Sequence, residues 1–317
     1  MQITLEIQLP DNFRRSDFLL FHQRDTQMLA ERWDGDNLHK GIIWNNLPAC
    51  LQFHFHAGNF LILNLDIDSG RKKIALENTR TALHQLATHM LGLNQPTADF
   101  EVFAARHADV RQLIAQQSGL RVPQAASPFE ALSWAITGQQ ISLGAAISLR
   151  RKLIQRAGVT HSSGILCYPQ AEHILVLTED ELRACSFSKT KASTLLALAA
   201  AIQNGALPLQ QWLVDYWNGN LLAADDIYAQ LINQRGIGPW TIHYALLRGF
   251  GYMDGSLHGD AAVRRNLQLL LTTQLTQQQY RSAEKISPRE TEAWLANFSP
   301  WRALIAAHLW AMQEKPD

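Results

Sequence analysis

The N-terminal part of the chain alternates apolar and polar residues with the period of two that is typical of β-strands. An apolar run rich in Leu and Ile follows at residues 60–67, and helical segments are predicted at about 13–23 and 71–91. The sequence therefore predicts an α+β module over residues 1–92. The alternating apolar residues are Ile3, Leu5, Ile7 and Leu9 in one strand and Leu51, Phe53 and Phe55 in another.

From Pro96 onward the apolar positions recur with the period of a helix, so the remainder of the chain is predicted to be all-helical. No internal repeat, low-complexity tract or long linker interrupts it. The predicted helices cover about residues 99–117, 128–137, 141–157, 179–185, 189–204, 222–234, 239–250, 260–271, 276–284, 288–297 and 300–313.

Several of these helices carry an explicit start signal. The segments Ser127–Glu130, Thr178–Glu181 and Ser287–Glu290 have the Ser/Thr-x-x-Glu spacing of a capping box. Ser299–Pro300 opens the last helix with Pro near the first helical position, where the missing N–H is not needed. We therefore expect well-defined helix N-termini.

Composition places the protein among ordinary globular chains. Its 317 residues include 28 basic and 28 acidic ones, so any nucleic-acid-binding surface must be a local patch. The scattered Cys50, Cys167 and Cys185 indicate no disulfide framework and favour a reducing cytoplasm. The first residues alternate like a strand and lack the basic segment of a signal peptide, and no apolar run is long enough to span a membrane.

His54 and His56 share one face of a predicted strand, a spacing that can suit a metal ion. No third ligand is in view, so a pair of solvated histidines is the alternative that we favour.

The stretch from Leu231 to Asn266 has the strongest functional pattern. It predicts a helix ending near Gln234, a tight turn containing Gly236 and Gly238, and a second helix that begins at Pro239. Backbone N–H groups at such a turn can hold a phosphate without net positive charge on the protein. The alternative is a corner between two helices, with glycine present for geometric reasons only.

Asp260 follows a Gly-rich loop and directly precedes a helix. It can be a simple N-cap, or an acid placed beside the hairpin. Trp240, Tyr244 and Trp301 add aromatic area near the same motif, where they can stack on a flat or cationic group or simply pack in the core.

The segment Gly138–Ser142 separates two predicted helices. It is either a connector or a finger that reaches toward a ligand. The second of these helices carries basic residues that are a solvated face by default and a phosphate patch as the alternative: Arg150, Arg151, Lys152 and Arg156.

These motifs resemble the helix-hairpin-helix DNA glycosylase superfamily, and within it the 3-methyladenine DNA glycosylase II branch. The hairpin matches at residues 236–241, followed by Arg248-Gly249 and residues 257–260. Residues 300–302 and 308–310 match the end of the family pattern, and 128–130, 138–142 and 191–199 match its inner helices. The likeness covers the chain, with a weak N-terminal third.

The resemblance implies a mostly α fold with an N-terminal α+β domain of the TATA-binding-protein-like kind. It implies an N-terminal domain over residues 1–92 and a helical domain over 128–252 that contains the helix-hairpin-helix. A second helical subdomain is expected from 93–127 and 253–317, with the catalytic cleft between the two helical parts.

By residue match, the resemblance implies that Asp260 is the catalytic aspartate. Base-pocket positions fall on Trp240, Tyr244 and Trp301, and Phe21 is expected there from the N-terminal helix. DNA contacts fall on Gly236, Gly238 and Thr241, with Gln140 inserted into the gap that the flipped nucleotide leaves. The backbone carbonyls of Ile232, Gln234 and Ile237 fall on a monovalent cation site, for Na⁺ or K⁺; no other cofactor is expected.

The resemblance also suggests the reaction. Family members that cut the DNA strand carry Lys where this chain has Trp240, so a monofunctional glycosylase without AP lyase activity is expected. The iron–sulfur cysteines of another branch are absent. The expected partner is double-stranded DNA with damaged bases, such as 3-methyladenine or 7-methylguanine, bound by a monomer. The alternative is a non-catalytic helix-hairpin-helix DNA-binding protein.

Overall fold

The computed structural model describes residues 1–70, 75–272 and 285–312. The N-terminal part is a five-stranded antiparallel sheet in the order β1-β5-β4-β3-β2. The predicted strands are confirmed, and apolar residues of β1 are buried at every second position. The strands are β1 (Gln2–Gln8), β2 (Glu31–Asp34), β3 (Asn37–Trp44), β4 (Leu47–His56) and β5 (Phe60–Ile67).

Strands β2 and β3 were not predicted, because two residues hide the alternation of β3. Lys40 lies on the buried side of β3 and is 0% exposed. At the next position, Gly41 lies so close to the carbonyl of Leu166 that a side chain would collide with it. A charged residue and a glycine in a strand therefore mark the place where the sheet meets the helical part.

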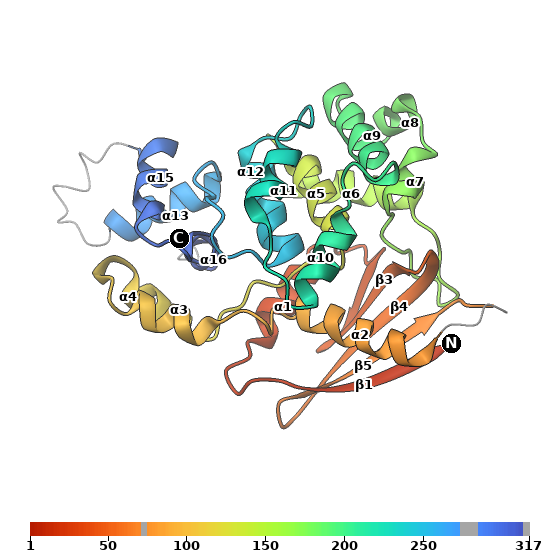
Figure 1. The fold of residues 1–317 in the computed structure, drawn as a ribbon, viewed down its shortest axis with the longest axis horizontal. Helices are drawn as coiled ribbons and strands as arrows, with labels where there is room; N and C mark the ends of the chain where they lie inside the picture. Colours follow the sequence, from red (N-terminus) through yellow and green to blue (C-terminus); the bar gives the residue numbers. More distant parts are fainter. Residues whose placement is uncertain (71–74, 273–284, 313–317) are drawn as a thin grey trace.

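Two helices accompany the sheet. Helix α1 (Arg15–His22) and helix α2 (Leu76–Met90) correspond to the predicted helices, and α2 packs on the sheet through Leu83, Leu86 and Met90. Figure 1 shows α2 running across the sheet, with most of the other helices above the sheet in this view and α10 next to α2.

The remainder of the described chain is helical, as predicted, with changes in detail. The predicted helix 99–117 is broken at 105–107, helices α7 and α10 were not predicted, and the predicted helix 276–284 lies outside the described residues. The helices are α3 (Thr97–Ala104), α4 (Ala108–Gln116), α5 (Pro128–Gly138), α6 (Leu143–Ala157), α7 (Ala171–Leu175), α8 (Glu179–Ala184), α9 (Lys189–Gln203), α10 (Leu209–Trp217), α11 (Ala224–Leu231), α12 (Pro239–Ala245), α13 (Ala261–Thr272), α15 (Pro288–Ala296) and α16 (Arg302–Trp310).

The predicted helix 239–250 changes its winding halfway. After α12 the chain forms a π-helical turn, η1 (Leu246–Phe250), and ends at Gly251 in the left-handed conformation with φ 77°. Single π turns inside helices are rare and occur often at functional sites. Here the turn carries Arg248, which lies in the candidate site.

Two of the three predicted capping boxes are complete, at Thr178 and at Ser287. At the third, Ser127 Oγ accepts the hydrogen bond from Glu130 N at 3.1 Å, but the Glu130 side chain is drawn elsewhere. Its carboxylate accepts from Lys40 Nζ and from Ala126 N. The capping-box prediction is therefore wrong for the Glu130 side chain, because its carboxylate binds the buried Lys40 ammonium group instead of completing the cap.

Buried apolar side chains form three large clusters. One joins the sheet to α1 and α2, one fills the helices from α5 to α12, and one joins α3 and α4 to the C-terminal helices. Figure 1 shows this third group, with α13, α15 and α16, at the end of the molecule away from the sheet. The boundaries proposed for the domains stay a prediction.

The three cysteines are free and buried. Burial raises the pKa of the Cys50 and Cys167 thiols to about 11, which keeps them unreactive. Within the described part of the chain, no helix combines the length and apolar character needed to cross a membrane.

Candidate active site

The helix-hairpin-helix unit is present as predicted, from α11 through the turn to α12. Its two glycines have different reasons to be glycine. Gly236 has φ 85°, and a side chain there would collide with Thr194. Gly238 has φ −111°, which any residue can adopt, and a Cβ atom would meet open space. The fold explains Gly236 but not Gly238, whose bare backbone is left accessible to an external group.

The loop after α5 is fastened to this turn by Gln139, a residue that we did not single out from the sequence. Gln139 Nε2 donates to the carbonyl oxygen of Gly236 at 3.0 Å and to Thr241 Oγ1 at 2.8 Å. Thr241 is only 2% exposed, so its hydroxyl serves this internal contact. The loop is therefore a finger with a fixed base.

Gln140 is the exposed tip of that finger. Its backbone is left-handed, with φ 57°, and the residue is exposed to solvent. Two apolar side chains beside it are also exposed, Ile141 at 38% and Leu143 at 58%. Exposed apolar groups around an accessible amide are suited to contact with stacked bases.

Asp260 accepts four hydrogen bonds and is partly buried. Its Oδ1 accepts from the backbone N–H groups of Ala262 and Val263, at 2.9 and 3.0 Å, so the N-cap interpretation is confirmed. The indole of Trp240 donates to Oδ2 at 3.0 Å, and the indole of Trp310 donates to Oδ1 at 3.1 Å. Donors at both oxygens fix the orientation of the carboxylate.

Three aromatic rings surround this carboxylate. Tyr244 lies between two indoles, with ring centroids 5.5 Å from Trp240 and 6.2 Å from Trp310. Trp310 was missed as a site residue, although its motif, residues 308–310, was part of the family pattern. It lies at the end of α16 and reaches Asp260 across 50 residues of sequence.

The structure does not bring Trp301 into this group. Trp301 packs against Phe100, with ring centroids 5.8 Å apart, and lines a different cavity. It precedes α16, whereas Trp310 ends that helix. Trp301 is thus at the wrong end of α16 for the predicted pocket, and Trp310 takes the expected place.

Phe21 lies where α1 approaches the helical part, between two guanidinium groups. The Arg24 guanidinium carbon is 4.0 Å from the centre of the Phe21 ring, and that of Arg248 is 4.4 Å away. Arg248 also lies 5.4 Å from the Trp310 ring, so it connects Phe21 to the aromatic group around Asp260. The structure therefore brings Phe21, Trp310 and Asp260 into one continuous arrangement.

Arg248 is partly buried and makes no ion pair with any described residue. Its Nη1 donates to the carbonyl of Pro123 at 2.7 Å, and its Nε has no partner among the described residues. Burial lowers the pKa of Arg248 to about 10, and nearby Arg24 adds to this effect, whereas Tyr244 opposes it. The group is still charged at neutral pH, and the Pro123 carbonyl, Tyr244 and two aromatic faces stabilise this charge.

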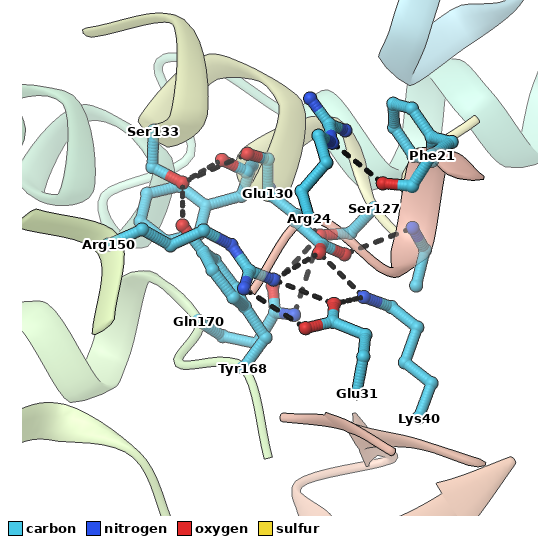
Figure 2. A network of polar contacts seen from close by, with 12 residues as sticks. Phe21, Arg24, Glu31, Lys40, Ser127, Glu130, Ser133, Arg150, Tyr168 and Gln170 are labelled. Atoms are coloured by element: carbon cyan, nitrogen blue, oxygen red, sulfur yellow. Dashed lines mark hydrogen bonds and ion pairs between the residues drawn. The ribbon is translucent and has the colours of Figure 1, made fainter. Parts of the chain in front are cut away.

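A small cavity of about 40 Å³ lies behind Phe21, Tyr244 and Arg248. It is large enough for ordered water and too small for a base. Its far wall is formed by charged side chains that Figure 2 shows as one network, with Glu31, Lys40, Glu130 and Arg150 at its centre.

This network joins the sheet to the helices. Lys40 Nζ lies 2.6 Å from Glu31 and 2.7 Å from Glu130, and Arg150 lies 2.7 Å from Glu31. Burial alone would raise the pKa of Glu31, but Arg150 and Lys40 hold it far below its ordinary value. Two acids and two bases compensate one another, so the interior stays neutral (Figure 2).

The interpretations of the basic residues of α6 need correction. Arg150 belongs to the buried network, and Arg151 pairs with Asp25 at 2.7 Å. Lys152 donates to Ser186, and Arg156 pairs with Glu181. Arg150 and Arg151 are thus engaged by acids from the N-terminal part of the chain, whereas Lys152 and Arg156 lie at the surface, as the solvated-face interpretation predicts.

The metal hypothesis for His54 and His56 receives no support. The His54 ring faces His39, at 5.8 Å between centroids, and His56 stacks on Phe60 at 4.9 Å. No group of three or more His, Cys, Asp or Glu side chains suited to a metal occurs among the described residues.

Comparison with known proteins shows the family to which the chain belongs. The family model described as "HhH-GPD superfamily base excision DNA repair protein" matches residues 133–292, which is half of the chain and includes the hairpin and Asp260. The chain belongs to this superfamily, and its helix-hairpin-helix fold and site agree with that membership.

The similar proteins are DNA repair glycosylases by name. The chain is 26% identical over 189 residues to "DNA-3-methyladenine glycosylase" of Bacillus subtilis, covering 59% of this chain and 60% of that protein. It is 26% identical over 203 residues to "DNA-3-methyladenine glycosylase 2" of Escherichia coli, covering 63% and 62%. The match thus spans about three fifths of the length of these relatives.

The fold as a whole has a close counterpart among solved structures. "3-methyladenine dna-glycosylase from Archaeoglobus fulgidus" superposes with a TM-score of 0.76 at 19% identity, covering 96% of this chain and 97% of that one. This likeness extends over the N-terminal sheet as well as the helices, so the fold class predicted from the sequence is confirmed.

Proposed function

We propose that this protein is a DNA glycosylase of base excision repair that hydrolyses the N-glycosidic bond of alkylated purines after base flipping. One observation carries the proposal: Asp260, beside the hairpin, is held by Trp240 and Trp310 within an aromatic group. The names of the relatives, which refer to 3-methyladenine, support the substrate class.

The chemistry follows from the charge that develops in the reaction. As the glycosidic bond breaks, positive charge builds on the sugar, and a fixed carboxylate stabilises it without reorganisation. The indole N–H groups hold the Asp260 carboxylate in one orientation. Alkylated purines that are already cationic leave readily and need little help from an acid, and aromatic faces favour their charge.

We propose that the hairpin and the finger together hold the DNA. Gly236, Gly238 and the N–H groups at the start of α12, including that of Thr241, would contact phosphate oxygens. Gln140 would enter the stack where the flipped nucleotide was. Because phosphate contacts dominate, binding would depend strongly on salt and little on sequence.

The reaction would stop at base removal. A lyase needs an amine that attacks the sugar to form a Schiff base, and Trp240 stands at the position where strand-cutting relatives carry Lys. Borohydride would therefore trap no covalent complex between this protein and DNA. Efficient trapping would contradict the monofunctional assignment.

A monovalent cation would be held by the carbonyls of Ile232, Gln234 and Ile237. Neutral oxygen donors suit Na⁺ or K⁺, and the turn places these carbonyls within six residues. Gln234 O already accepts the hydrogen bond from Ile237 N at 3.1 Å and keeps one lone pair. The cation would brace the turn, and DNA affinity would then depend on its presence.

The test of the function is release of bases from methylated duplex DNA, with products separated by chromatography. Asp260→Asn should reduce excision by at least about a hundredfold, because the charge that stabilises the transition state is lost. Asp254→Asn is the matched control, because Asp254 binds Arg302 instead of the aromatic group.

Both variants should still bind DNA. Wild-type excision by Asp260→Asn would contradict the assignment of the catalytic acid. DNA binding without any base release by the wild-type protein would instead favour the alternative, a non-catalytic helix-hairpin-helix DNA-binding protein.

A further inference from the structure

Helix α13 connects the carboxylate of Asp260 to the end of α16. Asp260 caps the N-terminus of α13, and the Trp310 indole reaches the same carboxylate from the last residue of α16. The two helices pack against each other at the end of the molecule away from the sheet (Figure 1). The position of the indole relative to Asp260 therefore depends on how the end of α16 is held against α13.

The packing between these two helices is mainly apolar, with one polar exception. Val263 and Leu267 of α13 are 0% exposed, and so are Ile305 and Leu309 of α16. Asn266 lies beside them on α13 and is only 3% exposed. Burying an amide costs free energy unless it is hydrogen-bonded, whereas a leucine of nearly the same size has no such cost. The amide therefore needs an explanation beyond packing.

Asn266 binds the carbonyl group that directly precedes Trp310. Its Nδ2 donates to the carbonyl oxygen of Leu309 at 2.7 Å, in a buried hydrogen bond. This oxygen also accepts from the backbone N–H of Met312 at 3.2 Å, so it would keep a partner without Asn266. What the amide adds is a fixed distance between the two helices.

The end of a helix is the place where such a bond has the largest effect. Terminal turns fray, because their last carbonyl groups lack partners within the helix. Trp310 is the last residue of α16 and is partly exposed. Its ring lies 6.2 Å from the Tyr244 ring and 5.4 Å from the Arg248 guanidinium, contacts that fix its orientation less strictly than a hydrogen bond does. Fraying of this turn would move the indole N–H away from Asp260.

We infer that Asn266 is a positioning residue for the proposed excision reaction, on which this inference rests. Its amide ties the last turn of α16 to α13, so that the Trp310 N–H stays 3.1 Å from Asp260 Oδ1. The contacts close a ring, from Asp260 along α13 to Asn266, across to the end of α16, and through Trp310 back to the carboxylate. The carboxylate and its indole donor are thereby held as one unit.

The test is a double-mutant cycle on single-turnover release of bases from methylated duplex DNA. Asn266→Leu removes the amide at similar size and should slow excision by about three- to tenfold, the effect of one hydrogen bond. Adding this change to Trp310→Phe should slow the reaction by less than about a further twofold, because Asn266 acts through the indole N–H. DNA affinity, measured by fluorescence anisotropy, should be unchanged in all three variants. Losses that multiply in the double variant would show that Asn266 acts through general packing and would overturn the inference.

The matched control is Gln268→Leu, on the same helix. Gln268 Oε1 accepts a hydrogen bond from Ile286 N at 2.8 Å, so this variant removes a contact between α13 and the segment before α15. It should leave the excision rate unchanged. Equal losses in Gln268→Leu and Asn266→Leu would mean that any weakening of α13 slows the reaction, which contradicts a specific role for Asn266.

Amide hydrogen exchange follows the end of α16 independently of activity. Asn266→Leu should speed exchange at residues 308–312 by about three- to tenfold, as expected for the loss of one hydrogen bond. Asn266→Ala, which also lacks the amide, should give the same result, and unaltered exchange in both variants would overturn the inference. A wild-type protein that releases no base would contradict the proposed function and the role of Asn266 with it. Wild-type excision by Asn266→Leu would contradict the role of Asn266 alone.

Discussion

At the scale of single residues, Asp260 combines a structural contact with the proposed catalytic role. It caps α13 through Ala262 N and Val263 N, and the two indole N–H groups donate one hydrogen bond to each of its carboxylate oxygens. An N-cap and a catalytic acid are usually alternatives in the interpretation of a sequence. Under the proposed function, the cap would supply the rigidity that the acid needs, because a carboxylate held by backbone donors would not turn away from the reacting sugar.

The exchange of roles between Trp301 and Trp310 gives a paired prediction. Trp310→Phe removes the N–H that donates to Asp260 and should slow single-turnover excision by about ten- to a hundredfold, the range for a hydrogen bond to a charged group. Trp301→Phe retains an aromatic ring that can pack on Phe100, and its excision rate should stay within about twofold of the wild-type rate. Similar losses in both variants would mean that Trp310 acts only through packing.

The limits of inference from the sequence are clearest at this scale. Asp260, Tyr244 and Trp240 were placed correctly next to one another because they lie on one short stretch of chain. Trp310 and Trp301 are both aromatic and both at an end of α16, and only the path of the chain decides which reaches Asp260. The stacking of Arg248 between Phe21 and Trp310 joins three distant segments and leaves no local signal.

At the scale of elements, the fold requires one of the two hairpin glycines and does not require the other. Gly236 is enforced by a left-handed backbone and by Thr194, whereas Gly238 faces open space in an ordinary conformation. The pattern Gly-x-Gly in the sequence looks symmetrical, and the structure shows that it is not.

Two alanine substitutions test this division. Gly236→Ala should lower the free energy of unfolding by about 1–3 kcal/mol, because a Cβ is strained at this φ and collides with Thr194. Gly238→Ala should fold with unchanged or slightly higher stability, yet bind duplex DNA more weakly. Denaturant titration and fluorescence anisotropy measure the two effects. Undiminished DNA affinity in Gly238→Ala would argue against close approach of a phosphate at this turn.

Strand β3 and the start of α5 show why some elements escaped prediction. Lys40 is charged and 0% exposed, so it contradicts the rule that charged residues face solvent. Glu130 has the spacing of a capping box and serves Lys40 instead. Both departures have one cause, which is a partner more than 85 residues away in the sequence. Patterns based on near neighbours cannot detect it.

At the scale of the whole molecule, the buried network determines how the sheet is attached to the helices. Lys40→Met should lower the free energy of unfolding by about 3–5 kcal/mol, because Glu31 and Glu130 then share Arg150 alone in a buried place. The control is Lys152→Met, which removes a contact with Ser186 at the surface and should change stability by less than about 0.5 kcal/mol. Chemical denaturation compares the two. A neutral effect of Lys40→Met would mean that the network is not needed for stability.

Buried histidines make the stability of the folded molecule depend on pH. Burial lowers the pKa of His89 and of His308 to about 3, from an ordinary value of 6.5. At a pH between the folded and the unfolded pKa, the histidines bind protons in the unfolded chain and not in the folded chain. Stability should therefore be complete above pH 6.5 and should fall on acidification, by up to about 1.4 kcal/mol per pH unit for each histidine. The low pKa of Glu31 adds a further loss below its ordinary value of 4.5.

Denaturation measured between pH 4 and 8 tests this dependence. His308→Asn should flatten the acid slope by about one histidine, since its ring is 1% exposed and bonds Gln117. A slope unaltered by that variant would show that the ring becomes protonated in the folded state.

Gln139 has a consequence for how the protein inspects DNA. Because its amide is bonded to Gly236 and Thr241, the tip at Gln140 cannot move independently of the hairpin turn. Under the proposed function, the hairpin turn would contact the DNA backbone and Gln140 would contact the base stack at a fixed separation. An intact, stiff duplex would resist the bend that allows both contacts at once, whereas a duplex weakened by a damaged base would bend more easily. How easily the duplex bends, before any base reaches Asp260, would thus be the first property that distinguishes damaged from normal DNA.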